Sequence, residues 1–157
     1  MKILITGSNG FIAKNLIIRL GEMGYDNLVF TDRNSTVEEI HSSVVDVDFV
    51  YHLAGVNRPK DEYEFVDGNV DLTKRIIDLL VASGSKVPLV LSSSTQVGLD
   101  NPYGRSKEAA EKLVLSYMEN HDVPVYVFQL PNVFGKWSKP NYNSAVATFC
   151  YNTVHDL

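Results

Sequence analysis

The sequence predicts an α/β fold in which a doubly wound parallel sheet is covered by helices on both faces. Short apolar segments rich in β-branched residues alternate with longer segments of helical periodicity along nearly the whole chain. This alternation is typical of parallel sheets, because each parallel connection has to cross the sheet, usually through a helix. The 157 residues are enough for one domain with a sizeable core and too few for two full domains.

Each expected strand is a short apolar run that ends at a glycine or at polar residues. The first is a continuous run of Ile, Leu, Ile and Thr that stops at Gly7, which is typical of a strand buried on both faces. We expect the strands at residues 3–6, 28–31, 48–54, 87–92 and 123–130.

The expected helices carry apolar residues three and four positions apart. The first places Phe11, Leu16 and Leu20 on one face and ends near Gly21 and Gly24. We expect the helices at residues 11–20, 36–43, 62–83, 102–120 and 144–154. In the third of these, the positions expected to be buried are Val66, Val70, Ile76, Ile77, Leu80 and Val81.

The composition argues against several classes of function. The net charge is −5 and the pI is about 5.3, so no basic excess is available to neutralise the phosphates of a nucleic acid. No apolar stretch approaches the roughly 20 residues that span a bilayer, and no signal peptide is recognisable, so we expect a cytoplasmic protein without a membrane partner. One cysteine and four histidines offer no metal-binding pattern, and Cys150 is expected to be a small buried residue.

A glycine-rich turn connects the first strand to the first helix. Gly7 permits a tight turn, Gly10 lets a ligand approach the backbone, and Ala13 keeps the helix close to the strand, as in the Rossmann fingerprint. The N–H groups and the dipole of the helix N-terminus favour phosphate there. A plain strand-to-helix turn is the alternative, but the position of the motif favours a Rossmann-like pyrophosphate site formed by Gly7, Ser8, Asn9, Gly10, Phe11 and Ile12.

The second strand ends at Asp32 and Arg33, where a dinucleotide fold binds the adenosine ribose. A carboxylate there favours NAD(H) through the 2′-hydroxyl, whereas an arginine favours NADP(H) through the 2′-phosphate. Both residues are present, and a solvated charge pair is a further alternative. We favour NADP(H), with NAD(H) possible, because Asn34, Ser35 and Thr36 add donors beside the arginine.

Tyr103 and Lys107 form a Y-x-x-x-K motif at the start of an expected helix, with Pro102 in its first turn. The spacing places the phenol and the ammonium on one helical face. A neighbouring ammonium lowers the pKa of a phenol and prepares it for proton transfer. The pair alone occurs often by chance, but residues 92–95, a run of hydroxyl side chains, end the preceding strand at the edge where such sheets bind ligands.

Five motifs follow one another in an order that is typical of one large family. They are residues 6–13, His52-Leu53-Ala54-Gly55, Leu91-Ser92-Ser93-Ser94, Pro102-Tyr103-Gly104-Arg105-Ser106-Lys107 and Pro131-Asn132-Val133-Phe134-Gly135. The series resembles the extended short-chain dehydrogenases/reductases of the NAD-dependent epimerase/dehydratase family over nearly the whole chain.

The resemblance implies a role for each matching residue. Tyr103 would be the catalytic acid/base and Lys107 its modulator and a ribose ligand. Ser94 would bind the reacting carbonyl, with Ser93 as the alternative. Asn69 resembles the helix asparagine that supports the site, with an ordinary surface residue as the alternative. The other cofactor contacts implied are Leu53, Ala54, Gly55, Ser92, Pro131, Asn132 and Val133.

Residues 52–59, 100–104, 134–137 and 139–151 resemble, more narrowly, the capsule- and O-antigen-assembling reductases of the UDP-N-acetyl-L-fucosamine pathway. This resemblance implies NADPH-dependent reduction of the C4 keto group of a UDP-2-acetamido-2,6-dideoxy-hexos-4-ulose. It also implies a homodimer formed through the helices at 62–83 and 102–120. The expected substrate contacts are Val56, Asn57, Arg58, Ser94, Thr95, Asn132, Lys136, Trp137, Lys139 and Asn143. Asn141 and Tyr142 of the loop after residue 135 are further candidates for contact with a UDP-sugar, although this loop is alternatively a plain linker.

The organisation of the chain changes after Gly135. Residues 1–135 are expected to form the NAD(P)-binding Rossmann domain, and residues 136–157 the start of a substrate-binding part that is truncated. Only 18 residues separate Arg33 from His52, which predicts an abbreviated adenine pocket. Gln129 stands where the family commonly has an arginine.

Two other functions are compatible with the motifs. One is a nucleotide-sugar 4-epimerase or dehydratase that recycles a bound NAD⁺, although Thr95 and Gln96 stand where a dehydratase usually has an acidic pair. The other is a non-catalytic NAD(P)-binding sensor, although such proteins commonly lose the Y-x-x-x-K pair that this chain keeps.

Overall fold

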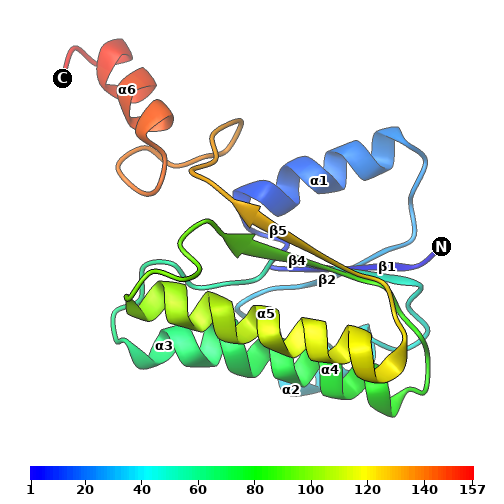
Figure 1. Cartoon of the computed structure of the whole chain (residues 1–157). Helices are drawn as coiled ribbons and strands as arrows, with labels where there is room; N and C mark the ends of the chain where they lie inside the picture. The colour runs from blue at the N-terminus through cyan, green and yellow to red at the C-terminus, as the bar shows by residue number, and fades with distance from the viewer.

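The computed structural model describes all 157 residues, and its centre is a five-stranded sheet in the order β2-β1-β3-β4-β5 (Figure 1). Every pair of neighbouring strands is parallel, which confirms the predicted doubly wound class. The chain leaves β1 towards β2 on one side and then crosses to β3 on the other, so the strand order reverses at β1. The strands are β1 (Ile3–Thr6), β2 (Leu28–Thr31), β3 (Phe49–His52), β4 (Leu89–Ser94) and β5 (Val125–Leu130).

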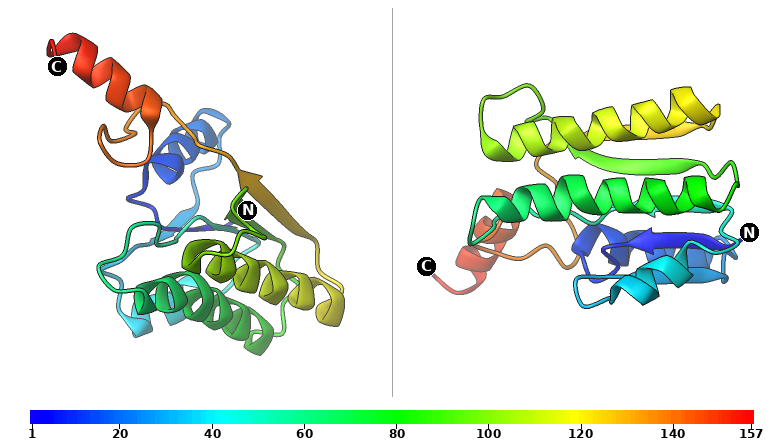
Figure 2. Two further views of the ribbon diagram at one scale, coloured as in Figure 1. Left: turned by 60° about the vertical axis from the view of Figure 1, so that its left-hand side comes forward. Right: turned by 90° about the horizontal axis from the view of Figure 1, so that it is seen from below.

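Helices cover both faces of the sheet unequally. One face carries α1 (Phe11–Glu22), and the other carries α2 (Val37–Ser43), α4 (Leu72–Ala82) and α5 (Pro102–His121), which lie side by side (Figure 2). A short α3 (Tyr63–Phe65) and a π-helical segment, η1 (Val66–Asp71), lead into α4. The last helix, α6 (Ala145–Val154), stands beyond the carboxyl ends of the strands. None of the helices is long and apolar enough to cross a bilayer.

Two hydrophobic cores separate the layers. Successive side chains of a strand point to opposite faces, so Ile3 and Ile5 pack with Ala13 and Leu20 under α1. Leu4 points the other way, into a larger core between the sheet and the helices α2, α4 and α5. That core includes Val50, Leu89, Leu91, Ile76, Leu80 and Val114.

The prediction of one regular helix over residues 62–83 was wrong in its first half. Ile76, Ile77 and Leu80 are buried as expected, but Val70 is only half-buried, Val66 is 43% exposed and Val81 is 38% exposed. A π-turn contains more residues than an α-turn, so the segment before Leu72 is rotated and Val66 leaves the core-facing stripe. Val81 follows Leu80 directly and therefore points to a different side of the helix.

The expectation that Cys150 is buried was also wrong. Cys150 is exposed, and no residue of α6 is buried. The apolar composition of this segment suggested a core-facing helix, but in this chain α6 packs no face against the sheet.

Candidate active site

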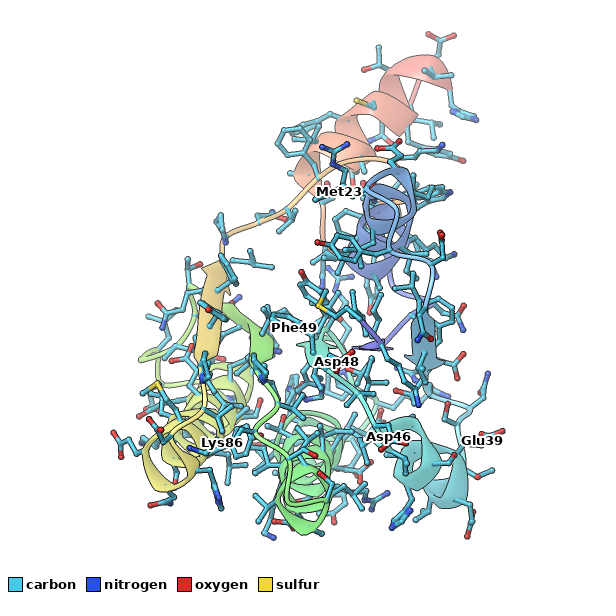
Figure 3. All side chains as sticks on the ribbon, turned by 90° about the vertical axis from the view of Figure 1, so that its right-hand side faces the viewer. Met23, Glu39, Asp46, Asp48, Phe49 and Lys86 are labelled. Atoms are coloured by element: carbon cyan, nitrogen blue, oxygen red, sulfur yellow. The ribbon has the colours of Figure 1, made fainter.

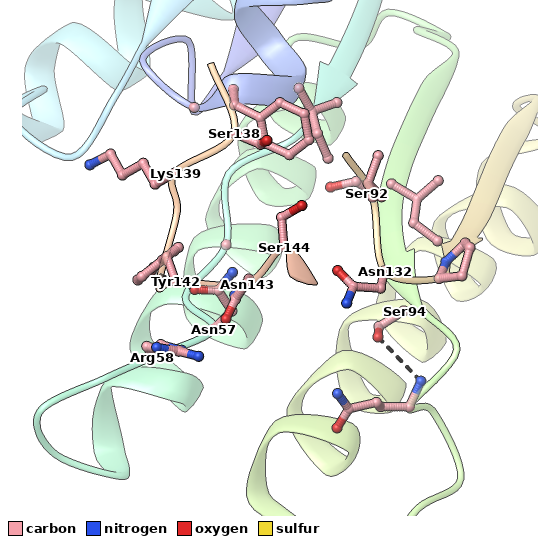
Figure 4. Close-up of a pocket in the computed structure, with 18 of the residues that line it drawn as sticks. Asn57, Arg58, Ser92, Ser94, Asn132, Ser138, Lys139, Tyr142, Asn143 and Ser144 are labelled. Atoms are coloured by element: carbon pink, nitrogen blue, oxygen red, sulfur yellow. Dashed lines mark hydrogen bonds between the residues drawn. The ribbon is translucent and has the colours of Figure 1, made fainter. Parts of the chain in front are cut away.

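A cavity of about 1030 Å³ lies at the carboxyl ends of the central strands. Its walls are the turn after β1, the loop after β3, the ends of β4 and β5, the start of α5 and residues 138–149 (Figure 4). This is the edge at which open α/β sheets bind ligands, and the volume suits a nucleotide-sized ligand.

The glycine turn has the geometry of a phosphate site. Gly7 has a φ of +69°, and a Cβ there would lie 2.7 Å from Ala54 Cα, so a side chain at this position is excluded on both counts. The Gly10 amide donates to the Gly7 carbonyl at 2.8 Å. Gly10 is the N-cap of α1 and provides no side-chain cap, so the N–H groups of the first turn remain available to an anion.

Asp32 and Arg33 differ in whether their side chains are hydrogen-bonded within the protein. The Asp32 carboxylate accepts from the Asn34 amide at 2.7 Å and from the Asn9 side chain, and the Asp32 amide donates to Ser35 Oγ at 3.0 Å. Arg33 is exposed and makes neither an ion pair nor a hydrogen bond through its guanidinium. Of the two, the guanidinium is therefore the group that is free to bind a ligand.

Lys107 is buried at the base of the cavity, where its Nζ donates to the Ser92 carbonyl at 3.0 Å. Burial lowers the pKa of Lys107 to about 8, although the Glu111 carboxylate opposes this shift. Burial raises the pKa of Tyr103, and the Ser94 hydroxyl acts in the opposite direction. The pKa of the phenol is therefore raised rather than lowered in this structure, because burial outweighs the other influences on it.

The three serines at the end of β4 point to alternate sides of the strand. Ser94 Oγ accepts from the Gln96 amide at 3.2 Å (Figure 4) and is the hydroxyl that influences the phenol of Tyr103. Ser93 Oγ is buried without a hydrogen-bond partner. Its register neighbour on β5 is Gln129, whose amide donates to the Glu111 carboxylate instead. The geometry favours Ser94 over Ser93 as the partner of the phenol.

Asn69 joins the loop after β3 to the start of α5. It is 2% exposed, which excludes the alternative of an ordinary surface residue. Its side chain accepts from the Val56 amide at 2.8 Å and donates to the Val56 carbonyl at 2.9 Å. It also donates to Ser106 Oγ at 2.9 Å, and that hydroxyl donates to the Tyr103 carbonyl at 2.8 Å. Asn69 thus fixes the loop and the start of α5 relative to each other.

Two loops face each other across the outer part of the cavity. The Tyr142 hydroxyl lies 2.8 Å from Asn57 Oδ1, and the Arg58 guanidinium carbon lies 5.1 Å from the centre of the Tyr142 ring. The segment 138–144 therefore approaches the loop after β3, as Figure 4 shows. Lys139 and Asn143 lie on the same side as Tyr142 and also line the cavity.

Most of the residues that the sequence singled out line this cavity. They are Gly7, Gly10, Phe11, Ile12, Ala13, Leu53, Gly55, Val56, Asn57, Arg58, Ser92, Ser93, Ser94, Thr95, Tyr103, Lys107, Pro131, Asn132, Val133, Lys139, Asn141, Tyr142 and Asn143.

A second group lies outside the lining. Asp32 and Arg33 end β2, whereas Lys136 and Trp137 contact each other, with the ammonium 4.5 Å from the ring centre. The Lys136 carbonyl accepts from Asn15 of α1 at 2.9 Å, so the sequence proposal of substrate contacts at 136 and 137 is not supported by a position in the cavity. The members of this group are Ser8, Asn9, Asp32, Arg33, Ala54, Asn69, Lys136 and Trp137.

Several lining residues were not singled out from the sequence. Ser144 is the N-cap of α6 and accepts from the Ala147 amide at 3.2 Å, and only this capping pattern is visible in the sequence. The others depend on how the loop folds back over the cavity, which no local pattern encodes. The residues missed are Gln96, Leu130, Ser138, Ser144, Ala145, Thr148 and Phe149. No group of three or more His, Cys, Asp or Glu residues is arranged to hold a metal ion.

The strand order, the uncapped glycine turn and the cavity at the switch point define a Rossmann-type nucleotide-binding protein. The model of the NAD dependent epimerase/dehydratase family matches residues 3–156. The chain therefore belongs to this NAD(P)-binding family.

Two similar proteins narrow the comparison. The chain is 48% identical over all 157 residues to UDP-2-acetamido-2,6-beta-L-arabino-hexul-4-ose reductase from Pseudomonas aeruginosa, and covers 42% of that protein. The crystal structure of capsular polysaccharide assembling protein CapF from Staphylococcus aureus superposes with a TM-score of 0.86 at 44% identity. That alignment covers 99% of this chain and 42% of CapF. The chain thus spans less than half the length of these relatives.

The fold is shared more widely. UDP-glucuronic acid 4-epimerase from Bacillus cereus, solved in complex with NAD, superposes with a TM-score of 0.83. At 21% identity, over 99% of this chain and 64% of the epimerase, this likeness supports the fold alone.

Proposed function

We propose that the chain is the reductase part of an enzyme that reduces the C4 keto group of a UDP-2-acetamido-2,6-dideoxy-hexos-4-ulose in capsule or O-antigen sugar biosynthesis. One observation carries the proposal: Ser94, Tyr103 and Lys107 meet in a cavity that begins at an uncapped phosphate turn. The similarity to the Pseudomonas reductase supports the substrate class.

The residues of the chain can supply the proton for such a reduction. When a reduced nicotinamide cofactor is bound, it supplies the hydride that adds to C4. Tyr103 keeps its proton at neutral pH, because burial raises the pKa of the phenol, and it can donate that proton to the C4 oxygen. Ser94 adds a hydrogen bond to the same oxygen, and Lys107 provides the nearby positive charge that stabilises the phenolate left behind.

The turn and the end of β2 fit a phosphorylated dinucleotide. The excluded Cβ at Gly7 and the free amides of α1 leave room and donors for a pyrophosphate. The free Arg33 guanidinium and the internally bonded Asp32 carboxylate favour a 2′-phosphate over a 2′-hydroxyl. We therefore propose NADP(H) as the preferred cofactor, with NAD(H) as the weaker one.

The wider organisation of the protein is also proposed here. Residues 1–135 would bind the cofactor, and residues 136–157 would begin the substrate-binding part, of which Lys139 and Asn143 already face the cavity. Cytoplasmic location and a homodimer through η1, α4 and α5 follow from the family resemblance. Tyr63 of α3, Val66 of η1 and Val81 of α4 are exposed, which is compatible with such a dimer.

The direct experiment incubates the chain with NADPH and the UDP-4-keto sugar, and follows nicotinamide absorbance together with the mass of the sugar product. We expect equimolar loss of NADPH and gain of the 4-hydroxy sugar, with both abolished by Tyr103→Phe. Conversion of the sugar without net loss of cofactor would point to the epimerase class. Tight binding of NADPH and sugar without turnover would point to a sensor.

A further inference from the structure

A continuous chain of hydrogen bonds runs through the interior between β1 and the α4 layer. The register of the sheet places Thr6 of β1 beside His52 of β3. Thr6 Oγ1 lies 2.7 Å from His52 Nδ1, and His52 Nε2 lies 2.8 Å from Thr73 Oγ1. All three side chains are at most 1% exposed, and none of them belongs to the cavity lining. This trio is called the Thr–His–Thr chain below.

The partners at the two ends determine where every proton lies. The Thr73 hydroxyl donates to the Asn69 carbonyl at 2.6 Å, so its oxygen can only accept from His52, which requires a proton on Nε2. Burial lowers the pKa of His52 to about 3, so the imidazole is neutral and Nδ1 has no proton. Nδ1 therefore accepts from the Thr6 hydroxyl, whose oxygen accepts from the Ala54 amide at 3.1 Å. One tautomer alone satisfies all four hydrogen bonds.

The two ends of the Thr–His–Thr chain lie at the two halves of the candidate site. Thr6 precedes Gly7 and holds Ala54, whose backbone is the wall that excludes a side chain at Gly7. At the other end, Thr73 fixes the backbone carbonyl of Asn69, whose side chain leads on to the backbone of Tyr103. The phosphate turn and the catalytic helix are thereby joined through the protein interior as well as across the cavity.

We propose that His52 is a positioning residue that, through Thr6 and Thr73, sets the phosphate turn against the Asn69–Tyr103 side of the site. The proposal deepens the proposed function, because it relies on a cofactor that rests on the turn and reacts beside Tyr103. A histidine that merely fills the core would have no directional bonds to groups at both halves of the site. If His52 has this role, loss of the Thr73 hydroxyl must change the conformation of the phosphate turn at Gly7.

The test combines imidazole and amide NMR with NADPH titration of the 157-residue chain and three variants. Thr73→Val removes the hydroxyl with little change in shape, and Thr73→Ser keeps the hydroxyl. Ser43→Ala is the matched control, because Ser43 is buried and donates to a helix carbonyl at 2.7 Å in α2, away from the chain. Thermal unfolding shows that each variant is folded.

In the wild type we expect the Nε2–H tautomer of His52 alone, without titration between about pH 5 and 8. Thr73→Val should mix the tautomers, shift the amides of Gly7 and Ala54, and weaken NADPH binding by about 10-fold, as expected for the loss of about one hydrogen bond, since 10-fold corresponds to about 1.4 kcal/mol. Thr73→Ser should restore all three, and Ser43→Ala should change none of them.

Other outcomes overturn the proposal. A protonated Nδ1, a His52 that titrates in this range, or a folded Thr73→Val whose Gly7 amide and NADPH affinity are unchanged would each refute it. If Thr73→Val does not fold, the wild-type tautomer and the Thr73→Ser variant decide. If the wild type binds neither NADPH nor NADH, the proposed function fails. The tautomer of His52 and the shift of the Gly7 amide in Thr73→Val still test the role of the Thr–His–Thr chain in that case.

Discussion

The polar groups at the two ends of the sheet differ in their exposure and in their pairing. At the amino end, onto which Figure 3 looks, charges pair on the surface: the Met1 ammonium lies 3.9 Å from the Asp48 carboxylate, and Lys86 pairs with Asp122 at 3.0 Å. At the carboxyl end, Lys107 is buried without a carboxylate within ion-pair distance, and Ser93 Oγ has no partner.

This difference indicates at which end of the sheet a ligand binds, and how much folding stability the binding groups cost. Exposed ion pairs such as Lys86–Asp122 contribute about 0–1 kcal/mol each, so the polar groups of the amino end change the free energy of folding only slightly. A buried ammonium costs free energy of folding unless it is fully paired. Groups that cost stability gather only at the carboxyl end, as expected where a ligand completes their hydrogen bonds.

The largest effect is expected from the phenol hydroxyls at the two ends. Tyr103→Phe removes the proposed proton donor and should reduce turnover by about 100-fold or more, the usual contribution of a general acid. Tyr117→Phe removes a buried hydroxyl at the amino end, which donates to the Val87 carbonyl at 3.1 Å. It should leave turnover unchanged and lower the free energy of unfolding by about 1 kcal/mol. Equal turnover of the two variants in a steady-state assay would contradict this assignment.

The buried ammonium should make the carboxyl end sensitive to pH. The folded-state pKa of Lys107 is about 8, below its ordinary value of 10.5, so the unfolded chain binds the extra proton between these values. The free energy of unfolding should therefore rise with pH across this interval, by at most about 3–4 kcal/mol at 1.36 kcal/mol per pKa unit. In denaturant titrations, Lys107→Met should abolish this rise. Parallel pH profiles of the wild type and the variant would refute it.

Glycines with positive φ at the two ends should respond differently to alanine. Gly7→Ala meets Ala54 at 2.7 Å and a φ of +69°, whereas Gly24→Ala has a φ of +82° and no atom within 4 Å. We expect a loss of about 1–3 kcal/mol and of cofactor binding for Gly7→Ala. Gly24→Ala should lose about 1 kcal/mol and keep its cofactor affinity. Calorimetry with and without NADPH separates these effects, and unimpaired binding by Gly7→Ala would exclude the turn as the phosphate site.

The smallest effects concern single exposed cations. Arg33→Ala should reduce the preference for NADPH over NADH by about 10-fold, equivalent to 1.4 kcal/mol, through loss of a charge-assisted bond to the 2′-phosphate. Lys86→Ala, at the amino end, should alter neither affinity and should change stability by less than about 1 kcal/mol. Fluorescence titration with both cofactors measures the ratio. An unchanged ratio in Arg33→Ala would assign the preference elsewhere.

The fold was predictable from the sequence because strands and helices differ in the period of their apolar residues. The same periodicity could not reveal η1, since nothing in residues 66–71 distinguishes a π-turn from an α-turn, and the predicted burial of Val66 failed for that reason. The predicted burial of Cys150 was wrong because the apolar composition of a segment does not indicate which surface the segment packs against.

The site was predictable where its chemistry depends on local spacing, as in the glycine turn and in Tyr103 and Lys107. It was not predictable where it depends on long-range contacts. The bond from Lys107 to the Ser92 carbonyl joins α5 to β4. The burial that raises the pKa of the Tyr103 phenol depends on the surrounding fold in the same way. The Thr–His–Thr chain joins residues 6, 52 and 73 and has no sequence signature of its own.

The most direct test of the difference between the two ends is a titration of the wild-type chain with NADPH, followed by amide chemical shifts. We predict saturable shifts in residues 7–13, 53–56 and 92–96 at the carboxyl end, with the amides of Lys2, Lys86 and Asp122 unmoved. Shifts centred on the amino end, or no shifts at saturating NADPH, would contradict the assignment of the carboxyl edge as the cofactor site.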